Sequence, residues 1–157
     1  ELQPLLDLMK LIEGHLSKNL PVSALGLNSD QMELLRPYPF LTTKKVIYVA
    51  NVAESDLPGM DNQYVRAVQE QARKEGNIVI PICAKIEEEI AQLELSERAD
   101  FLNTLGLTES GLDRLVKASF KLLGLITFLT TGQMETRAWT IKEGTNALDA
   151  AGEIHTD

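Results

Sequence analysis

The sequence predicts an α/β fold, and three observations support this prediction. Two short runs of β-branched and aliphatic residues, 46–50 and 78–82, are typical of strands buried on both faces of a parallel sheet. The segment between them carries apolar residues at helical spacing, so the three pieces form a strand–helix–strand unit. Such a unit places its strands parallel in one sheet, adjacent or at most one strand apart. Helical patterns flank the unit, and a second β-rich stretch follows.

The N-terminal segment is predicted to be an amphipathic helix. Its apolar residues recur at intervals of three and four, which fits either one face of a core helix or a short coiled-coil seam. These residues are Leu2, Leu5, Met9, Ile12 and Leu16. After a break at Pro21, Asn28 followed by Gln31 predicts a capping box at the start of a second, short helix, which Pro37 ends.

Within the strand–helix–strand unit, we expect the helix to begin after Pro58 and Gly59 and to end at Gly76. The residues predicted for its inner face are Tyr64, Val65, Val68 and Ala72. Pro81 has no N–H to give to a neighbouring strand, so we expect Ile82 to lie at a strand end or a bulge.

Three helical patterns follow the second strand. The first is rich in glutamate, and residues 87–89 are interpreted as its solvent-facing surface; its apolar face carries Ile86, Ile90 and Leu93. Ser96 is predicted to cap the second helix, and Ser110 with Asp113 to begin the third, which Gly124 ends. The residues of the third helix expected to face a core are Leu112, Leu115, Val116 and Phe120. Residues 125–130 and 136–141 are predicted to be strands joined by a turn at 131–132.

Composition excludes several classes of protein. The 157 residues carry a net charge of −8. A protein that binds nucleic acid mainly through its phosphates usually has a basic domain, so this class of protein is not indicated. No apolar run approaches the roughly 18 residues of a membrane span, so we expect no membrane partner. The histidines stand apart from any cluster of thiols or carboxylates, so no metal site is predicted. The single cysteine, Cys83, cannot form an intrachain disulfide and fits a reducing compartment, which predicts a cytoplasmic location.

Two loops are the candidate ligand site. In open parallel sheets, ligands bind at the carboxyl ends of the strands. The predicted strands end in a first loop, residues 51–54 (NVAE), and a second loop, residues 83–85 (CAK). P-loop GTPases place base-recognition elements in this arrangement, with Asn-Lys-x-Asp in the first loop and Ser-Ala-Lys in the second.

The departures from that pattern favour adenine. Glu54 is one methylene longer than the aspartate that pairs with the two donors of guanine, and Val52 replaces a lysine. Asn51 offers a donor and an acceptor that match N7 and N6 of adenine. The alternative for residues 51–54 is an ordinary polar loop between a strand and a helix. The alternative for Cys83 is the role of a small apolar residue at a strand end.

The resemblance to YchF/Obg-like ATPases extends over the whole chain. Residues 45–54 (KVIYVANVAE) resemble the specificity strand and loop of that family, which carries Asn-x-x-Glu in place of the guanine-reading motif. Residues 135–141 (ETRAWTI) and 150–157 (AAGEIHTD) are similar to the opening of its TGS domain. The resemblance implies a returning arm of a coiled-coil insertion at 1–40, the C-terminal half of a P-loop NTPase domain at 41–122, and the start of a β-grasp TGS domain at 123–157.

The function implied is that of an ATP-binding and ATP-hydrolysing protein, with ATP preferred over GTP, that associates with the large subunit of the ribosome. Asn51 would read the base edge, Val52 would contact the ring, and Glu54 would hold the loop or contact the base, with Cys83 and Ala84 as the opposite wall.

By the family's pattern, we expect the phosphate loop and the Mg²⁺ ligands to lie outside this chain, which should be inactive alone. We also expect exposed sheet edges that favour self-association. Two alternatives stay open: a non-catalytic module that docks on the ribosome, and a GTP-specific regulatory GTPase. Arg114, Lys117 and Lys121 share a helix face and are candidate RNA contacts, although a solvated face is the alternative.

Overall fold

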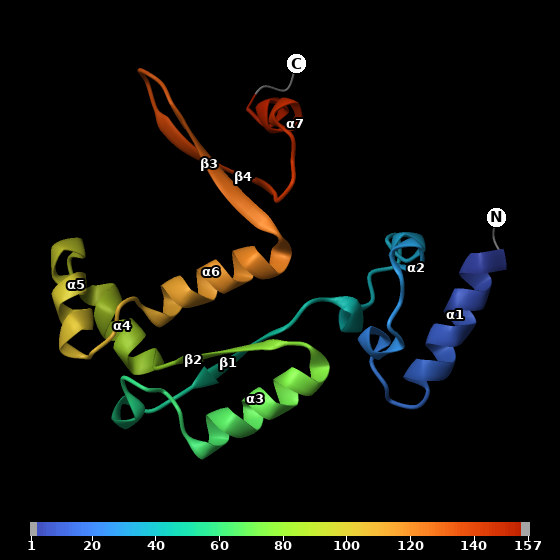
Figure 1. Cartoon of the computed structure of the whole chain (residues 1–157), viewed down its shortest axis with the longest axis horizontal. Helices are drawn as coiled ribbons and strands as arrows, with labels where there is room; N and C mark the ends of the chain where they lie inside the picture. The colour runs from blue at the N-terminus through green and yellow to red at the C-terminus, as the bar shows by residue number, and fades with distance from the viewer. Residues whose placement is uncertain (1–2, 155–157) are drawn as a thin grey trace. The chain divides into compact units, whose positions relative to one another are not determined.

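The computed structural model describes residues 3–154, and the chain separates into two units, Glu1–Val46 and Ile47–Asp157 (Figure 1). The first unit contains α1 (Gln3–Leu16), η1 (Val22–Leu25), α2 (Ser29–Leu34) and η2 (Leu41–Thr43). Its core consists of four buried side chains: Leu8, Ile12, Val22 and Leu35.

The predicted stripe of α1 is partly correct. Ile12 is buried and Leu5 and Met9 are half-buried, but Leu16 is exposed and Leu2 lies outside the described residues. Leu8, which the stripe left out, is buried beside Ile12, because residues one helical turn apart share a face.

The capping box of α2 is confirmed. The N–H of Gln31 donates to Asn28 Oδ1 at 2.9 Å, and the N–H of Asn28 donates to Gln31 Oε1 at 3.0 Å.

The strand–helix–strand unit of the second unit is also confirmed. β1 (Ile47–Asn51) and β2 (Ile78–Ile82) pair directly in parallel, with Asn51 opposite Ile82, and α3 (Gln63–Glu75) crosses between them. Ile82 ends β2, as the position of Pro81 predicts. The described residues add no third strand to this sheet, so each strand has one edge without a strand partner.

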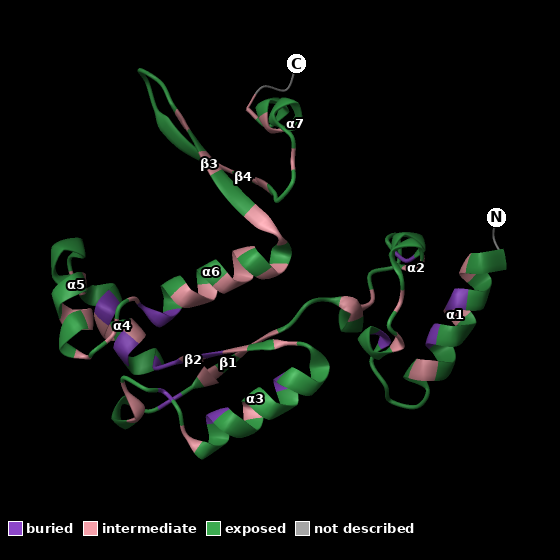
Figure 2. Cartoon of the chain, viewed as in Figure 1, coloured by how far each residue is buried: buried purple, intermediate pink, exposed green. Residues whose placement is uncertain are grey.

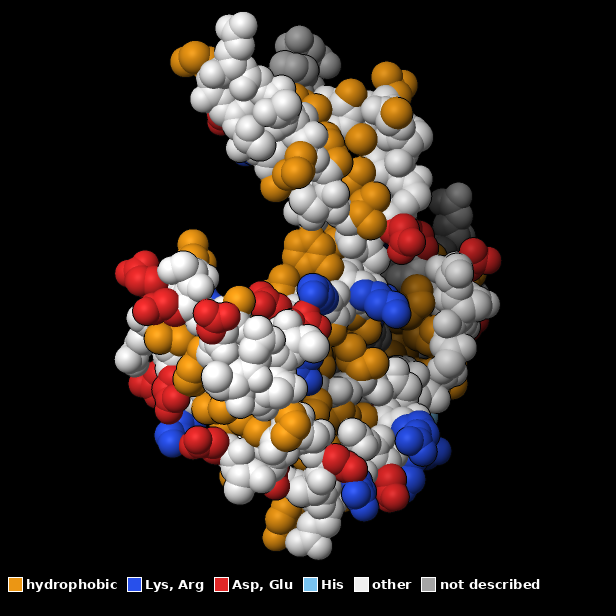
Figure 3. Space-filling view, turned by 60° about the vertical axis from the view of Figure 1, so that its left-hand side comes forward, with side chains coloured by type: hydrophobic (Ala, Val, Ile, Leu, Met, Phe, Trp, Pro, Cys, Tyr) orange, Lys and Arg blue, Asp and Glu red, His pale blue; other side chains and the backbone are white. Residues whose placement is uncertain are grey.

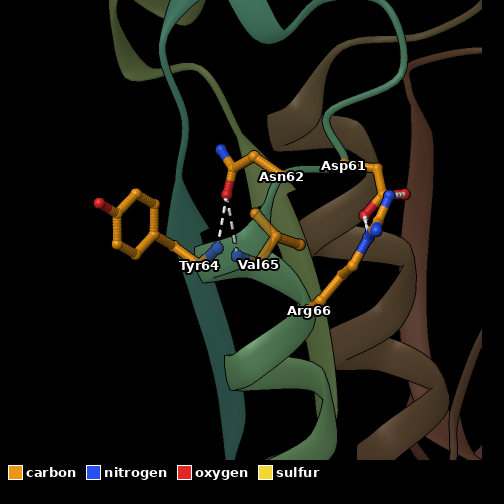
Figure 4. A network of polar contacts seen from close by, with 5 residues as sticks. All are labelled: Asp61, Asn62, Tyr64, Val65 and Arg66. Carbon is orange, nitrogen blue, oxygen red and sulfur yellow. Dashed lines mark hydrogen bonds and ion pairs between the residues drawn. The ribbon is translucent and has the colours of Figure 1, made fainter.

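Helix α3 begins at Gln63, after Pro58 and Gly59 as predicted, and the short 3-10 turn η3 (Glu54–Asp56) precedes these two residues. Asn62 caps it: its side chain accepts hydrogen bonds from the N–H groups of Tyr64 and Val65, both at 3.0 Å (Figure 4). Val65 and Ala72 are buried as expected and Val68 is half-buried, but Tyr64, also predicted for the inner face, is exposed. Gly76 ends the helix in the left-handed conformation, with φ 71°.

Three helices follow β2: α4 (Ala84–Gln92), α5 (Leu95–Thr104) and α6 (Gly111–Leu123). Buried residues gather where β2, α4 and the start of α6 meet (Figure 2). A hydrophobic core cluster joins α4 to α3 and to the chain that follows β1, and it contains Val52, Met60, Val65, Cys83, Ile86 and Ile90. Helix α5 corrects one prediction, since Glu94 rather than Ser96 stands at its N-cap and makes no side-chain capping bond.

The last elements are α6, the hairpin strands β3 (Leu125–Thr131) and β4 (Thr136–Lys142), and α7 (Ala147–Gly152). Ser110 caps α6 by accepting from the N–H of Asp113, and the hairpin is antiparallel, both as predicted. Leu112 and Val116, expected in a core, are exposed because no other described element covers this face of α6. Hydrophobic side chains also reach the surface along the hairpin (Figure 3).

Candidate nucleotide base site

The first and second loops lie at the same edge of the sheet and contact each other directly. The N–H of Ala84 donates to Asn51 Oδ1 at 3.0 Å, and the N–H of Val52 donates to the carbonyl of Ile82 at 2.9 Å. The bond between Val52 and Ile82 extends the backbone pairing of β1 and β2 by one residue. The bond between Ala84 and Asn51 uses a side chain of the first loop to hold the second loop. The parallel pairing of β1 and β2 thus places residues that are 33 positions apart within hydrogen-bonding distance.

A salt bridge spans the two loops farther out. Lys85 Nζ lies 2.7 Å from Glu54 Oε2 and 3.9 Å from Glu89 Oε1. The hydrogen bond to Glu54 raises the pKa of Lys85 above its ordinary value, and the nearby negative charges act in the same direction. Both side chains are more than half exposed, so the pair contributes little to stability, but it fixes a carboxylate and an ammonium side by side at the site.

Burial separates the five predicted site residues into two groups. Asn51, Glu54 and Ala84 are exposed. Val52 and Cys83 keep only 6% and 2% of their surface exposed, because both pack into the core below the loops. The groups presented to solvent at the site are therefore an amide, a carboxylate, a backbone segment and the ammonium of Lys85.

A hollow adjoins the first loop on the α3 side. Its volume is about 610 Å³, within the usual range of small-molecule pockets, and its lining includes Asn51, Val52, Asn62 and Tyr64. Glu54, Cys83 and Ala84 do not line it. Asn51 is thus the predicted site residue that faces both the hollow and the second loop.

The predicted basic stripe on α6 is largely engaged within the chain. Arg114 Nη2 donates to the carbonyl of Pro81 at 2.8 Å, and the Lys117 ammonium pairs with Glu109. Lys121 is exposed. In residues 3–154 there is no group of three or more histidine, cysteine or acidic side chains placed to hold a metal ion, and no helix there is long and apolar enough to cross a membrane.

Comparison with known proteins identifies relatives of the chain. The family model YchF-GTPase_C, described as a protein of unknown function (DUF933), matches residues 125–157. The Ribosome-binding ATPase YchF of Bacillus subtilis (strain 168) is 45% identical over 151 residues, which cover 96% of this chain and 41% of that protein. The protein of the same name from Escherichia coli O157:H7 is 46% identical over 134 residues, covering 85% of this chain and 36% of that protein.

A solved structure agrees with these matches. The Schizosaccharomyces pombe YchF GTPase aligns with a TM-score of 0.74 and 31% identity, over 83% of this chain and 35% of that chain. The chain belongs to the YchF family. The structural match confirms the predicted α/β class, and this YchF-family chain spans 36–41% of the length of the two bacterial relatives.

Two residues near the site were missed by the sequence analysis of this YchF-family chain. Lys85 completes the Cys-Ala-Lys pattern but was not assigned a role, and its pairing with Glu54 depends on the two loops meeting. Glu87 was interpreted as helix surface, yet it is half-buried and accepts hydrogen bonds from Gly111 and Leu112 at the start of α6. No local pattern signals that contact, because its partners lie at least 24 residues away.

Proposed function

We propose that this chain supplies the base-recognition part of a ribosome-associated protein that binds and hydrolyses nucleoside triphosphates, with ATP preferred over GTP. The observation that carries the proposal is the hydrogen bond from the N–H of Ala84 to Asn51 Oδ1, which brings the two base-recognition loops together at one edge of the sheet. The names of the Bacillus subtilis and Escherichia coli relatives, Ribosome-binding ATPase, support the activity, the ribosomal partner and a cytoplasmic location. The match at residues 125–157 supports a separate C-terminal domain in that region.

Asn51 has the chemistry to read a purine. Its Oδ1 already accepts one hydrogen bond from Ala84, and a carbonyl oxygen has a second lone pair that can accept from the 6-amino group of adenine. Its Nδ2 group can donate to N7 of the ring. Guanine carries a carbonyl at position 6, so Oδ1 would face another acceptor there. The orientation that the second loop imposes on Asn51 therefore favours adenine.

Glu54 supports the same preference. To bind guanine as the aspartate of a GTPase does, its carboxylate would have to turn both oxygens toward two donors of the base. Oε2 is already bonded to the ammonium of Lys85, whose positive charge also repels those donors. We assign Glu54 the role of holding the two loops together. Val52 and Cys83 support the loops from the core, so their contribution to a base contact is indirect.

Nucleosides provide a direct test, because they carry the base without the phosphates. We expect adenosine titrated into the ¹⁵N-labelled chain to shift the amide signals of Asn51, Ala84 and Lys85, and guanosine to bind several-fold more weakly. Removing one hydrogen-bonding side chain changes affinity by roughly 0.5–1.5 kcal/mol. Asn51→Ala should therefore weaken adenosine binding about threefold to tenfold.

Asn103→Ala is the matched control, because Asn103 is an exposed asparagine on α5, away from both loops. Equal affinities for adenosine and guanosine, or an adenosine affinity that Asn51→Ala leaves unchanged, would refute the base-reading role.

A further inference from the structure

The first turn of α6 contacts the chain on both sides of the second loop. On the C-terminal side, the Glu87 carboxylate accepts from the N–H of Gly111 at 2.7 Å through Oε1 and from the N–H of Leu112 at 3.0 Å through Oε2. Glu87 lies on α4, two residues after the loop ends at Lys85. A carboxylate that bonds two N–H groups at the start of a helix makes strong, charge-assisted hydrogen bonds.

On the N-terminal side of the second loop, α6 holds β2 through Arg114. Its Nη2 atom donates to the carbonyl of Pro81 at 2.8 Å and lies 3.1 Å from Met60 Sδ. Pro81 is two residues before Cys83. Residues 83–85 are therefore bracketed by two polar contacts, and both come from a single turn of one helix.

The packing at this turn is close. Ser110 and Gly111 are buried, and a Cβ atom placed on Gly111 would lie 2.8 Å from Glu87 Oε1 and 2.9 Å from Ile82 Cγ2. Ile82 is itself buried at the end of β2, immediately before the second loop. The N-terminus of α6 thus contacts the end of β2 and the side chain of Glu87 at van der Waals and hydrogen-bonding distance at once.

We propose that Glu87 and Arg114 are positioning residues for nucleotide binding, a role that rests on the proposed function of the second loop. By fixing both flanks of residues 83–85, they hold the Ala84 N–H where Asn51 Oδ1 accepts it, and so set the orientation of the Asn51 amide toward the base. Neither side chain belongs to the loops that would contact the base. The same helix leads through Gly124 into β3, so the element that positions the loop also carries the hairpin.

Amide hydrogen exchange tests the positioning role separately from nucleotide binding. Glu87→Gln keeps the shape of the side chain but replaces one accepting oxygen with an amide that faces an N–H. Losing a charge-assisted hydrogen bond should speed exchange of the Ala84 amide roughly tenfold. We expect amides in the middle of α3 to keep their wild-type rates. Glu88→Gln is the matched control, because Glu88 is exposed on the same helix.

Arg114→Met provides a second, independent variant. It removes the guanidinium from Pro81 while retaining an unbranched side chain, and Lys121→Met is its control on the exposed part of α6. We expect Arg114→Met also to speed exchange of the Ala84 amide several-fold. Glu87→Gln and Arg114→Met should each weaken adenosine binding by a similar factor, although neither residue touches the base.

The outcomes separate the two proposals. If the wild-type chain fails to bind adenosine, the proposed function is wrong, whereas selective loss of Ala84 protection would still support the positioning of the loop. The positioning role is overturned if Ala84 exchange is unchanged in Glu87→Gln, or if exchange speeds up equally in α3. It is likewise overturned if adenosine affinity is unchanged while Ala84 protection is lost.

Discussion

Replacing Gly111 with alanine tests whether the contact between α6, β2 and Glu87 is as close as its geometry indicates. The added methyl group would lie 2.8 Å from Glu87 Oε1, 2.9 Å from Ile82 Cγ2 and 3.0 Å from Ile82 Cγ1. Unstrained carbon–carbon contacts begin near about 3.5 Å, so the new atom overlaps two neighbours at once. Ile82 is buried in β2 and cannot turn away freely, and Glu87 can withdraw only by giving up its bond to the Gly111 N–H.

The expected change in the free energy of unfolding combines overpacking, loss of a hydrogen bond and a gain in helix propensity. Overpacking of a close-packed site costs about 1–3 kcal/mol. Loss of a hydrogen bond to a charged group costs roughly 1.5–3 kcal/mol, but the chain can relax to avoid one of the two penalties. Alanine recovers up to about 1 kcal/mol through its higher helix propensity. We therefore expect Gly111→Ala to lower the free energy of unfolding by about 2 kcal/mol.

Urea unfolding followed by circular dichroism measures this change. Gly14→Ala is the matched control, since Gly14 lies within α1 and has no atom within 4 Å of an added Cβ. It should leave stability unchanged or raise it by about 0.5–1 kcal/mol. A Gly111→Ala chain as stable as the wild type would refute the close contact and weaken the inference built on it.

Two further predictions concern the rest of the second unit. Arg66 donates two hydrogen bonds to Asp61, both at 2.9 Å, and lowers the pKa of that carboxyl (Figure 4). The lowered pKa means that the pair stabilises the fold above the unfolded-state pKa of about 3.9 and is lost as the pH falls through the folded-state pKa. Any stability difference between the wild type and Asp61→Asn should thus shrink from pH 6 to pH 2.5 in urea titrations, and a constant difference would contradict this account. Ile86 is 2% exposed, so Ile86→Ala should cost about 2–5 kcal/mol, whereas Leu95→Ala, at an 80% exposed position, should change stability by less than about 0.5 kcal/mol in the same assay.

Local sequence signals determined much of the secondary structure. The Asn28–Gln31 capping box, the Ser110 cap and the left-handed glycines at 76 and 124 depend on neighbours within one helical turn, and all four lie where the sequence places them. The apolar runs 46–50 and 78–82 likewise predicted a parallel pair, because a helical crossover of that length leaves few other arrangements. The edge that holds the candidate site follows from this topology, so Asn51 and Ala84 could be predicted to face each other.

Periodicity was a weaker guide to burial. Tyr64, Leu112 and Val116 have the spacing of core residues but are exposed, because burial depends on whether another element covers that face. The sequence of one helix indicates its apolar face, but it does not specify how much of that face another element will cover. The same limit explains why Leu8 was overlooked in α1 while Leu16 was included.

Only the tertiary structure decided the contacts between distant residues. The sequence predicted Glu87 to be a surface glutamate and Arg114 to be part of a basic stripe, since each is polar and lies on an amphipathic helix. Their partners, Gly111 and Pro81, are 24 and 33 residues away, and the pairing exists only because α6 packs against the end of β2. The sequence by itself specified the strands, their direction and the loops at their ends. The packing of α6 then determined which polar side chains position those loops, because hydrogen bonds between elements depend on distances that local sequence does not encode.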